Sequence, residues 1–159
     1  MRNSKTEKGN ILLVGIGNSG RRDDGLGWKF TDMASHLGYK EMDCEFRYQL
    51  QVEDVLMICR YDKVVFADAS HSAIKDGFEI KPCTPAHHYF FSSHMQSPET
   101  ILYLAKELYN KTPEAYTLAI SGHHWGLGTV LSREAQENLQ KAISFFKMKF
   151  APAGSEPAE

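Results

Sequence analysis

Apolar runs and segments of helical periodicity alternate along most of this chain. Five segments are rich enough in apolar or β-branched residues to predict strands: 10–16, 44–48, 63–69, 78–84 and 116–121. Apolar residues three and four positions apart predict four helices: 25–37, 52–59, 98–109 and 132–149. Because strands that alternate with helices favour a mostly parallel sheet between helical layers, the sequence predicts an α/β fold.

Residues at the ends of these segments support their boundaries. Ser132 is placed to cap the last helix. Asp23 or Asp24 is a candidate cap for the helix at 25–37, because a carboxylate accepts the free amides of a first turn. Pro82 has no backbone N–H to donate, so the strand that contains it is expected at an edge of the sheet.

A single domain accounts for the length and composition of the chain. It has 159 residues, of which 42% are apolar and 24% charged, as in an ordinary globular protein. We expect an N-terminal extension over 1–9, one domain over 10–149 and a disordered tail over 150–159. The N-terminus has no signal-peptide core and no apolar run reaches membrane-spanning length, so we expect a cytoplasmic protein without a membrane partner.

Charge and cysteine content argue against several classes of function. The net charge of −2 provides no general attraction to nucleic acid, which is therefore not an expected partner. Cys44, Cys59 and Cys83 form no CxxC pair, so free thiols in a reducing compartment are expected. The sequence has no Gly-x-Ser-x-Gly elbow, no HExxH helix and no recognisable Cys–His motif. A hydrolase with this sequence must therefore use water or a bound metal.

The segment from residue 11 to residue 27 carries the strongest local signal. An apolar strand leads into three closely spaced glycines, and two carboxylates, Asp23 and Asp24, precede the predicted helix. A strand, a glycine turn and a helix start usually suggest a phosphate site. Two negative charges at the mouth of this helix argue instead for a cation, a metal or a positively charged partner.

Carboxylates and imidazoles concentrate where a site is expected. In parallel α/β sheets ligands bind beyond the carboxyl ends of the strands. The residues predicted there are Asp23, Asp24, Asp68, His94, His123 and His124. Asp68 ends an apolar strand, where a carboxylate is costly to bury without a partner or a cation. Asp24, Asp68 and His94 form a reasonable ligand set for nickel, zinc or another borderline divalent ion, and His71 is placed to line the same cleft.

Each candidate also has a structural interpretation. The two adjacent aspartates can act as helix caps, and His94 near an apolar run can be a buried structural residue. The loop at 122–128 can be a polar surface loop with Trp125 folded onto the core. The spacing of the three proposed ligands is too long for a local metal motif, so the pattern alone does not choose between these interpretations.

Four segments together resemble the hydrogenase maturation proteases, the endopeptidases that trim the C-terminus of the large subunit of nickel–iron hydrogenases. In chain order they are GIGNSGRRDDGLG at 15–27, VVFADA at 64–69, SH at 93–94 and GLGTVLS at 126–132. The resemblance extends over about residues 10–148. The first motif is fairly specific, whereas the others gain weight from their order and spacing.

The resemblance implies a three-layer αβα sandwich with a mixed five-stranded sheet and one antiparallel strand. It implies an aspartic-type, metal-dependent endopeptidase in which Asp24, Asp68 and His94 are both catalytic and metal-binding residues. The residues expected to contact substrate are Gly17, Asn18, Asp23, His123 and His124. Nickel is expected to arrive with the substrate, a hydrogenase large-subunit precursor, and zinc or cadmium are further expected occupants. A monomer is expected.

Two loops depart from the pattern of the family. Residues 19–22 are more polar and basic than usual, and residues 123–125 read His-His-Trp where acidic or aromatic residues are common. Both loops are expected to shape the substrate groove, which leaves open which hydrogenase is served. One alternative is a catalytically silent metal-binding or scaffold protein of the same fold.

A dinucleotide-binding module is a second alternative. The first three glycines of the segment at 15–27 satisfy the dinucleotide spacing after a strand. The second predicted strand, however, ends without the acidic residue that would hold a ribose. Asp23 and Asp24 would also repel a pyrophosphate at the start of the helix.

Overall fold

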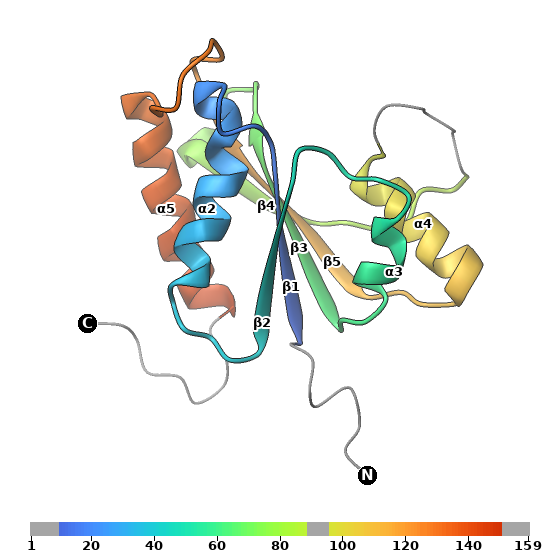
Figure 1. Ribbon diagram of the computed structural model, residues 1–159. Coiled ribbons are helices and arrows are strands. Elements are labelled where there is room, and N and C mark those ends of the chain that lie inside the picture. Colours follow the sequence, from blue (N-terminus) through green and yellow to red (C-terminus); the bar gives the residue numbers. More distant parts are fainter. Residues whose placement is uncertain (1–9, 89–95, 151–159) are drawn as a thin grey trace.

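A five-stranded sheet with helices on both faces forms the centre of the molecule (Figure 1). The computed structural model describes residues 10–88 and 96–150 of the chain. The strands are β1 (Ile11–Ile16), β2 (Met42–Arg47), β3 (Lys63–Ser70), β4 (Phe78–Pro82) and β5 (Glu114–Ser121). The helices are α2 (Leu26–Ser35), α3 (Asp54–Ile58), α4 (Pro98–Tyr109) and α5 (Arg133–Phe150). Two single turns of 3₁₀-helix, η1 (Arg22–Gly25) and η2 (Lys75–Gly77), precede α2 and β4.

The strand order β2-β1-β3-β5-β4 makes the sheet mixed, with one antiparallel pair. All neighbouring strands are parallel except β4 and β5, where Pro82 pairs with Tyr116. The antiparallel strand lies at the edge of the sheet, as its proline predicted. The predicted three-layer α/β architecture is therefore confirmed.

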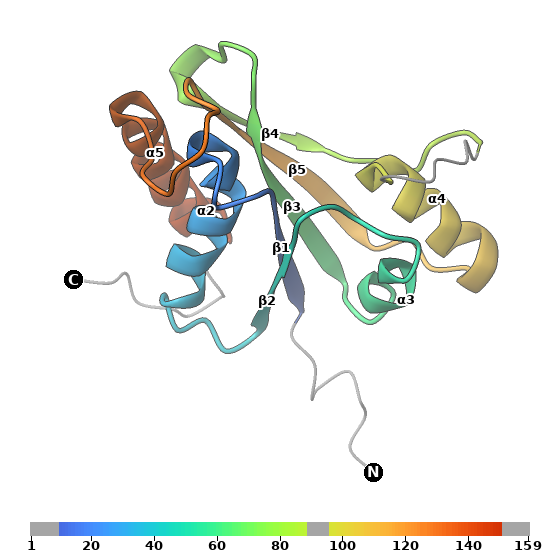
Figure 2. The same cartoon turned by 45° about the horizontal axis from the view of Figure 1, so that its top comes forward.

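Alternate residues of the central strands belong to two separate cores. Leu13 and Val65 pack under α2 and α5, whereas Leu12 and Val64 pack under α3 and α4. All four side chains are fully buried. Because helices cover both faces (Figures 1 and 2), β1 and β3 need apolar residues at consecutive positions, which explains the continuous runs in the sequence.

The start of α2 differs from its prediction. The helix expected at 25–37 opens with the 3₁₀ turn η1 and is α-helical only over Leu26–Ser35. Within the described structure its N-cap is Gly25, and no side chain there accepts a capping hydrogen bond. The expectation that Asp23 or Asp24 caps this helix is therefore wrong, because both carboxylates accept hydrogen bonds from other segments.

The ends of α5 follow the sequence more closely. The Ser132 hydroxyl accepts a hydrogen bond from the Ala135 N–H at 3.2 Å, as expected of the residue before the helix. The helix continues to Phe150, one residue beyond its predicted end, because that side chain is buried against the core. No helix within residues 10–88 and 96–150 combines the length and apolar character needed to cross a bilayer.

Some sequence-based predictions concern residues outside the described ranges. They are the extension at 1–9, the tail beyond residue 150, and the candidate ligand His94.

Candidate active site

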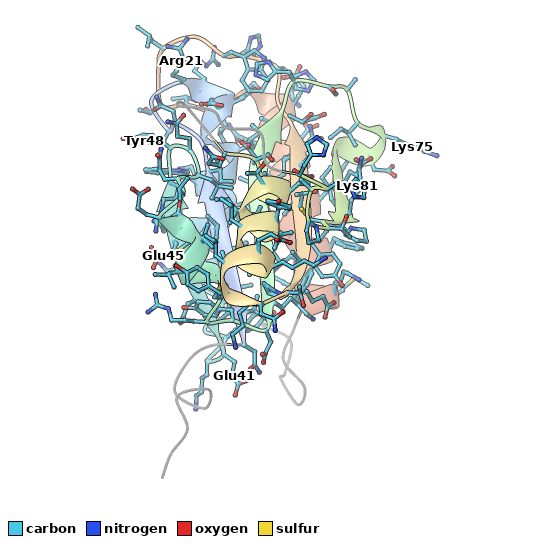
Figure 3. The ribbon with its side chains drawn as sticks, turned by 90° about the vertical axis from the view of Figure 1, so that its right-hand side faces the viewer. Arg21, Glu41, Glu45, Tyr48, Lys75 and Lys81 are labelled. Carbon is cyan, nitrogen blue, oxygen red and sulfur yellow. The ribbon has the colours of Figure 1, made fainter. Side chains whose placement is uncertain are left out.

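A cleft of about 660 Å³ lies at the carboxyl ends of the central strands. Its lining includes Gly17, Asp24, Tyr48, Asp68 and His71. The alternation of strands and helices predicted a ligand site at the carboxyl ends of the strands, and the cleft lies there. Figure 3 shows Arg21 at this end of the molecule and Glu41 at the opposite end.

The glycine turn after β1 brings Asp24 into the cleft. Gly17 has φ +144°, a backbone conformation that side chains rarely adopt, and a Cβ there would lie 2.1 Å from the Asp24 carbonyl oxygen. The Asn18 N–H is 3.1 Å from that carbonyl oxygen and 3.1 Å from the Asp24 Oδ2, and donates to both. Gly17 and Asn18 therefore shape the turn, and their contact with substrate stays a prediction.

Asp68 lies near the end of β3, where its strand register places it beside Ala119. Desolvation by the surrounding protein raises the pKa of Asp68 to about 7. The Ala69 N–H, which donates to Oδ1 at 2.8 Å, opposes this rise, and the negative charge of Asp24 adds to it. The side chain keeps solvent contact through the open side of the cleft, so it is both surrounded by protein and accessible to water.

The Asp24 carboxyl group is half-buried beside the same space. Desolvation raises its pKa, whereas the hydrogen bond from the Asn18 N–H and the positive charges of His71 and Arg21 lower it, and burial prevails. Two carboxyl groups with raised pKa values therefore line one cleft. Such perturbed groups cluster at functional sites more often than elsewhere, which marks this cleft as the candidate active site.

His71 enters the cleft just after β3 and rests on an aromatic ring. Its imidazole stacks on Trp125 with ring centroids 3.7 Å apart and an interplanar angle of 15°. Sequence reasoning placed His71 near the cleft from its distance to Asp68. The stacking with Trp125 gave no sequence signal, because the two residues come from distant segments that only the sheet brings together.

Asp23 supports the loop that carries Trp125. It has no exposed surface, and its Oδ2 accepts hydrogen bonds from the His123 N–H at 2.7 Å, the His124 N–H at 2.9 Å and the Ser132 hydroxyl at 2.6 Å. Its Oδ1 accepts from the Ser132 N–H at 2.8 Å. Burial favours a raised pKa for Asp23, but these hydrogen bonds together lower it.

Asp23 therefore holds the loop in this structure. Its carboxylate is enclosed by the loop and does not line the cleft, and its contact with substrate stays a prediction. The side chains of His123 and His124 are exposed on the same loop, and they too lie outside the lining of the cleft. Contact between these two imidazoles and a large protein substrate stays a prediction.

The predicted metal site is only partly within the described structure. Asp24 and Asp68 line one cleft, and the chain after His94 re-enters it at Gln96 and Ser97. Within residues 10–88 and 96–150, no group of three or more His, Cys, Asp and Glu side chains is arranged to hold a metal ion. The two carboxylates offer oxygen donors that suit a divalent cation, and the complete three-residue set stays a prediction.

The fold is shared with several solved structures, although no family model and no curated protein matches the sequence. The hydrogenase maturating endopeptidase HybD from E. coli has a TM-score of 0.69 at 14% identity, covering 91% of this chain and 94% of that chain. The nickel–iron hydrogenase maturation protease HycI from Thermococcus kodakarensis has a TM-score of 0.65 at 22% identity, covering 89% and 92%. A hydrogenase 2 maturation peptidase from a Thaumarchaeota archaeon has a TM-score of 0.66 at 17% identity, covering 89% and 98%.

The chain therefore has an α/β fold shared with the hydrogenase maturation proteases over most of its length. The resemblance read from the sequence is confirmed at the level of the fold. Because the identities are low, the activity has to be argued from the cleft itself.

Proposed function

We propose that this protein is an endopeptidase that removes the C-terminal peptide of a nickel–iron hydrogenase large-subunit precursor after nickel insertion. One observation carries the proposal: Asp24 and Asp68, from separate parts of the chain, line a single cleft at the carboxyl edge of the sheet. The names of the structural neighbours, which are hydrogenase maturation peptidases, support the same class of activity.

The two carboxylates are proposed to act on a metal that the substrate carries. They offer oxygen ligands on one side of the cleft, and His94 is the proposed third ligand. An incomplete set of protein ligands leaves coordination positions for groups of the substrate that already hold the nickel. If docking requires nickel, a metal-free precursor is not cleaved. The nickel ion of the substrate then determines which form of the precursor the enzyme accepts.

Hydrolysis of the peptide bond also requires a positioned water molecule. Neighbouring carboxyl groups can divide this task, since one can accept the proton of the water while the other donates a proton to the leaving amine. Asp24 and Asp68 are the only carboxyl groups among the described residues that line the cleft. We therefore assign the aspartic-type chemistry to this pair.

A processing assay with nickel-loaded and nickel-free large-subunit precursor tests the proposal. We expect mass spectrometry to detect release of the C-terminal peptide only from the nickel-loaded form. Asp24→Asn and Asp68→Asn are each expected to lower the rate by about 100-fold or more. Asp62→Asn is the matched control, because Asp62 is exposed before the first residue of β3 and outside the cleft.

Three outcomes contradict the proposal. Cleavage that ignores nickel removes the docking role of the metal, and full activity of either cleft variant removes the assigned chemistry. A folded protein that binds the nickel-loaded precursor without cutting it would instead identify the scaffold alternative.

A further inference from the structure

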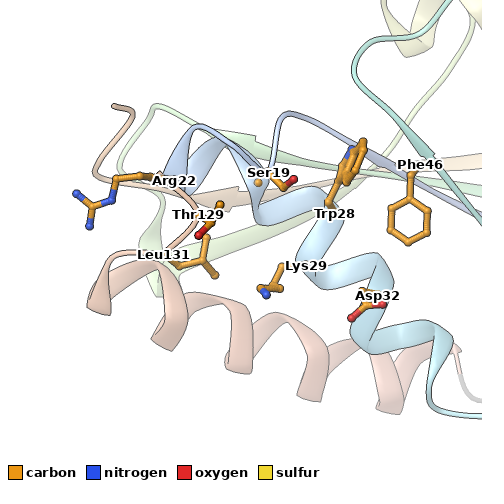
Figure 4. Close-up of a pocket in the computed structure, with 9 residues that line it drawn as sticks. Ser19, Arg22, Trp28, Lys29, Asp32, Phe46, Thr129 and Leu131 are labelled. Atoms are coloured by element: carbon orange, nitrogen blue, oxygen red, sulfur yellow. The ribbon is translucent and has the colours of Figure 1, made fainter. Parts of the chain in front are cut away.

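A second cavity of about 470 Å³ lies on the side of the glycine turn that faces α2, and we call it the α2 cavity. Its lining includes Arg22, Trp28, Lys29, Asp32, Phe46 and Thr129 (Figure 4). These residues come from η1, α2, β2 and the loop before α5. The reaction proposed for the cleft uses none of them.

One end of the α2 cavity is an aromatic wall. The rings of Trp28 and Phe46 meet edge to face with centroids 5.4 Å apart. The Trp28 Nε1–H donates to the Arg47 carbonyl oxygen at 2.9 Å, which fixes the indole against the edge of the sheet. Phe46 is 37% exposed, so part of its ring faces solvent and is accessible to a ligand.

Two cationic side chains, Arg22 and Lys29, also belong to the lining of the α2 cavity. The Arg22 Nε–H donates to the Val130 carbonyl oxygen at 3.1 Å, and the Arg22 backbone N–H donates to Gly128 at 2.7 Å. Among the described residues, neither the Arg22 guanidinium nor the Lys29 ammonium forms a salt bridge. The lining therefore has two cations that form no salt bridge within the part of the chain that the structure describes, and one carboxylate, Asp32, which lies three residues after Lys29 on α2.

The α2 cavity has a direction along its length. Figure 4 shows Arg22 and Thr129 at one end, Phe46 and Asp32 at the other, and Lys29 between them. The single carboxylate of the lining thus lies away from Arg22. An elongated ligand with an anionic tip and an apolar body fits this polarity in one orientation, because the reverse orientation brings its anion to Asp32.

The α2 cavity adjoins the candidate active site. Tyr48 lines the cleft and stacks on Trp28, a residue of the α2 cavity, with centroids 5.2 Å apart. Asp24 and Arg22 belong to the same 3₁₀ turn, one lining the cleft and the other the α2 cavity. The two spaces are therefore neighbours, and an extended peptide that leaves the cleft on this side continues into the α2 cavity.

We propose that the α2 cavity binds the C-terminal end of the protein substrate. The α-carboxylate lies at the Lys29 ammonium, on the side of the cavity toward Arg22, and an apolar side chain of the last residues packs on Trp28 and Phe46. This inference rests on the proposed function, since an enzyme that cuts near a C-terminus always meets a free carboxylate downstream of the cut. The Lys29 ammonium matches that group by a charge-assisted hydrogen bond, and the Arg22 guanidinium adds positive charge on that side of the cavity.

Binding of short peptides tests this inference without any cleavage. The probes are N-acetyl-Gly-Ala-Leu-Phe as the free acid and the same peptide as its C-terminal amide. The readout is the indole N–H resonance of Trp28, which is separated from that of Trp125, the second tryptophan of the chain, by a Trp125→Phe variant. We expect the free acid to shift the Trp28 resonance saturably and the amide to bind about tenfold more weakly.

Charge variants locate the carboxylate. Lys29→Gln is expected to weaken binding of the free acid about tenfold while leaving binding of the amide unchanged. Arg22→Gln is expected to act in the same direction. Lys106→Gln is the matched control, because Lys106 is an exposed lysine on α4, which covers the opposite face of the sheet, and this variant should bind like wild type.

Several results would overturn the inference. Equal binding of acid and amide, no binding of either, or insensitivity to Lys29→Gln removes the carboxylate subsite. An amidated peptide with an internal aspartate that binds as well as the free acid assigns the α2 cavity to acidic side chains rather than to chain ends. Acid-selective binding without any processing contradicts the proposed protease function alone, whereas processing without peptide binding contradicts only this inference.

Discussion

Asp23 and Ser132, which are 109 residues apart in the sequence, are joined by two hydrogen bonds. The Ser132 N–H donates to Oδ1 at 2.8 Å and the Ser132 hydroxyl donates to Oδ2 at 2.6 Å. The same hydroxyl accepts a hydrogen bond from the Ala135 N–H in the first turn of α5. One buried carboxylate therefore ties the glycine turn to the start of the last helix.

Replacing Asp23 with Asn should destabilise the protein by about 3 kcal/mol. An amide has one acceptor oxygen where the carboxylate has two, so buried donors on the loop lose their partner while the fixed charge is also lost. Urea unfolding followed by circular dichroism measures the change. Asp62→Asn, at an exposed position, is the control and should unfold like wild type. Equal stability of the two variants would show that the loop does not depend on Asp23.

Replacing Gly17 with Ala should cost about 3 kcal/mol of stability and distort the cleft. The new Cβ would meet the Asp24 carbonyl oxygen at 2.1 Å, and the residue would keep its φ of +144°. Gly126→Ala is the matched control, because nothing lies within 4 Å of a Cβ there, and it should leave the melting temperature nearly unchanged. A stable Gly17→Ala protein would mean that the turn can adopt another path.

Replacing Trp125 with Leu should release the His71 ring from its stacked position. Because the two rings lie 3.7 Å apart and nearly parallel, the His71 ring protons should resonate upfield of their usual position in the wild-type protein. The variant should move them downfield. Two-dimensional NMR of the histidine side chains measures this, and replacing exposed Phe46 with Leu is the comparison that should leave the His71 signals in place.

The thiol of Cys44 should alkylate slowly, with a rate that keeps rising to high pH. Burial, assisted by the negative charges of Asp43 and Glu45, raises the pKa of Cys44 to about 11. A group with a raised pKa stays protonated at pH 8, so reaction with iodoacetamide should be roughly 100-fold slower than for a free cysteine.

Mass spectrometry of a protein with Cys59→Ser and Cys83→Ser isolates the Cys44 signal. The rate should increase about tenfold per pH unit between 8 and 10, and urea should abolish the protection. Rapid alkylation at pH 8 in the folded state would contradict the assignment of Cys44 as a half-buried thiol with a raised pKa.

The sequence predicts the sheet well because its central strands obey a local rule. Residues in β1 and β3 are buried on both faces, so their apolar runs are continuous and easily recognised. Pro82 marked an edge strand by its missing N–H, and the structure places that strand, β4, at the edge. The order of strands and helices then placed Asp24 and Asp68 at one end of the sheet, where the structure has its cleft.

What the sequence could not predict depends on contacts between distant segments. The local pattern predicts that Asp23 caps the nearest helix. Its carboxylate instead accepts hydrogen bonds from residues about 100 positions later in the sequence, so it does not cap the helix. The stacking of His71 on Trp125 and the lining of the α2 cavity also depend on packing between loops that are distant in the sequence. The spacing of residue types along the chain gives no signal for such packing.

The dependence of the glycine turn on Ser132 has a consequence for synthesis on the ribosome. A nascent chain that already contains both cleft aspartates still lacks the amides and the hydroxyl that neutralise Asp23, because these lie at 123–132. The central strands β1, β3 and β5 are complete once residue 121 has emerged, but the loop that supports the glycine turn beside the cleft is not. A translation product that stops short of Ser132 would therefore lack both the donors that hold Asp23 and the helix α5, which supplies part of the core on one face of the sheet.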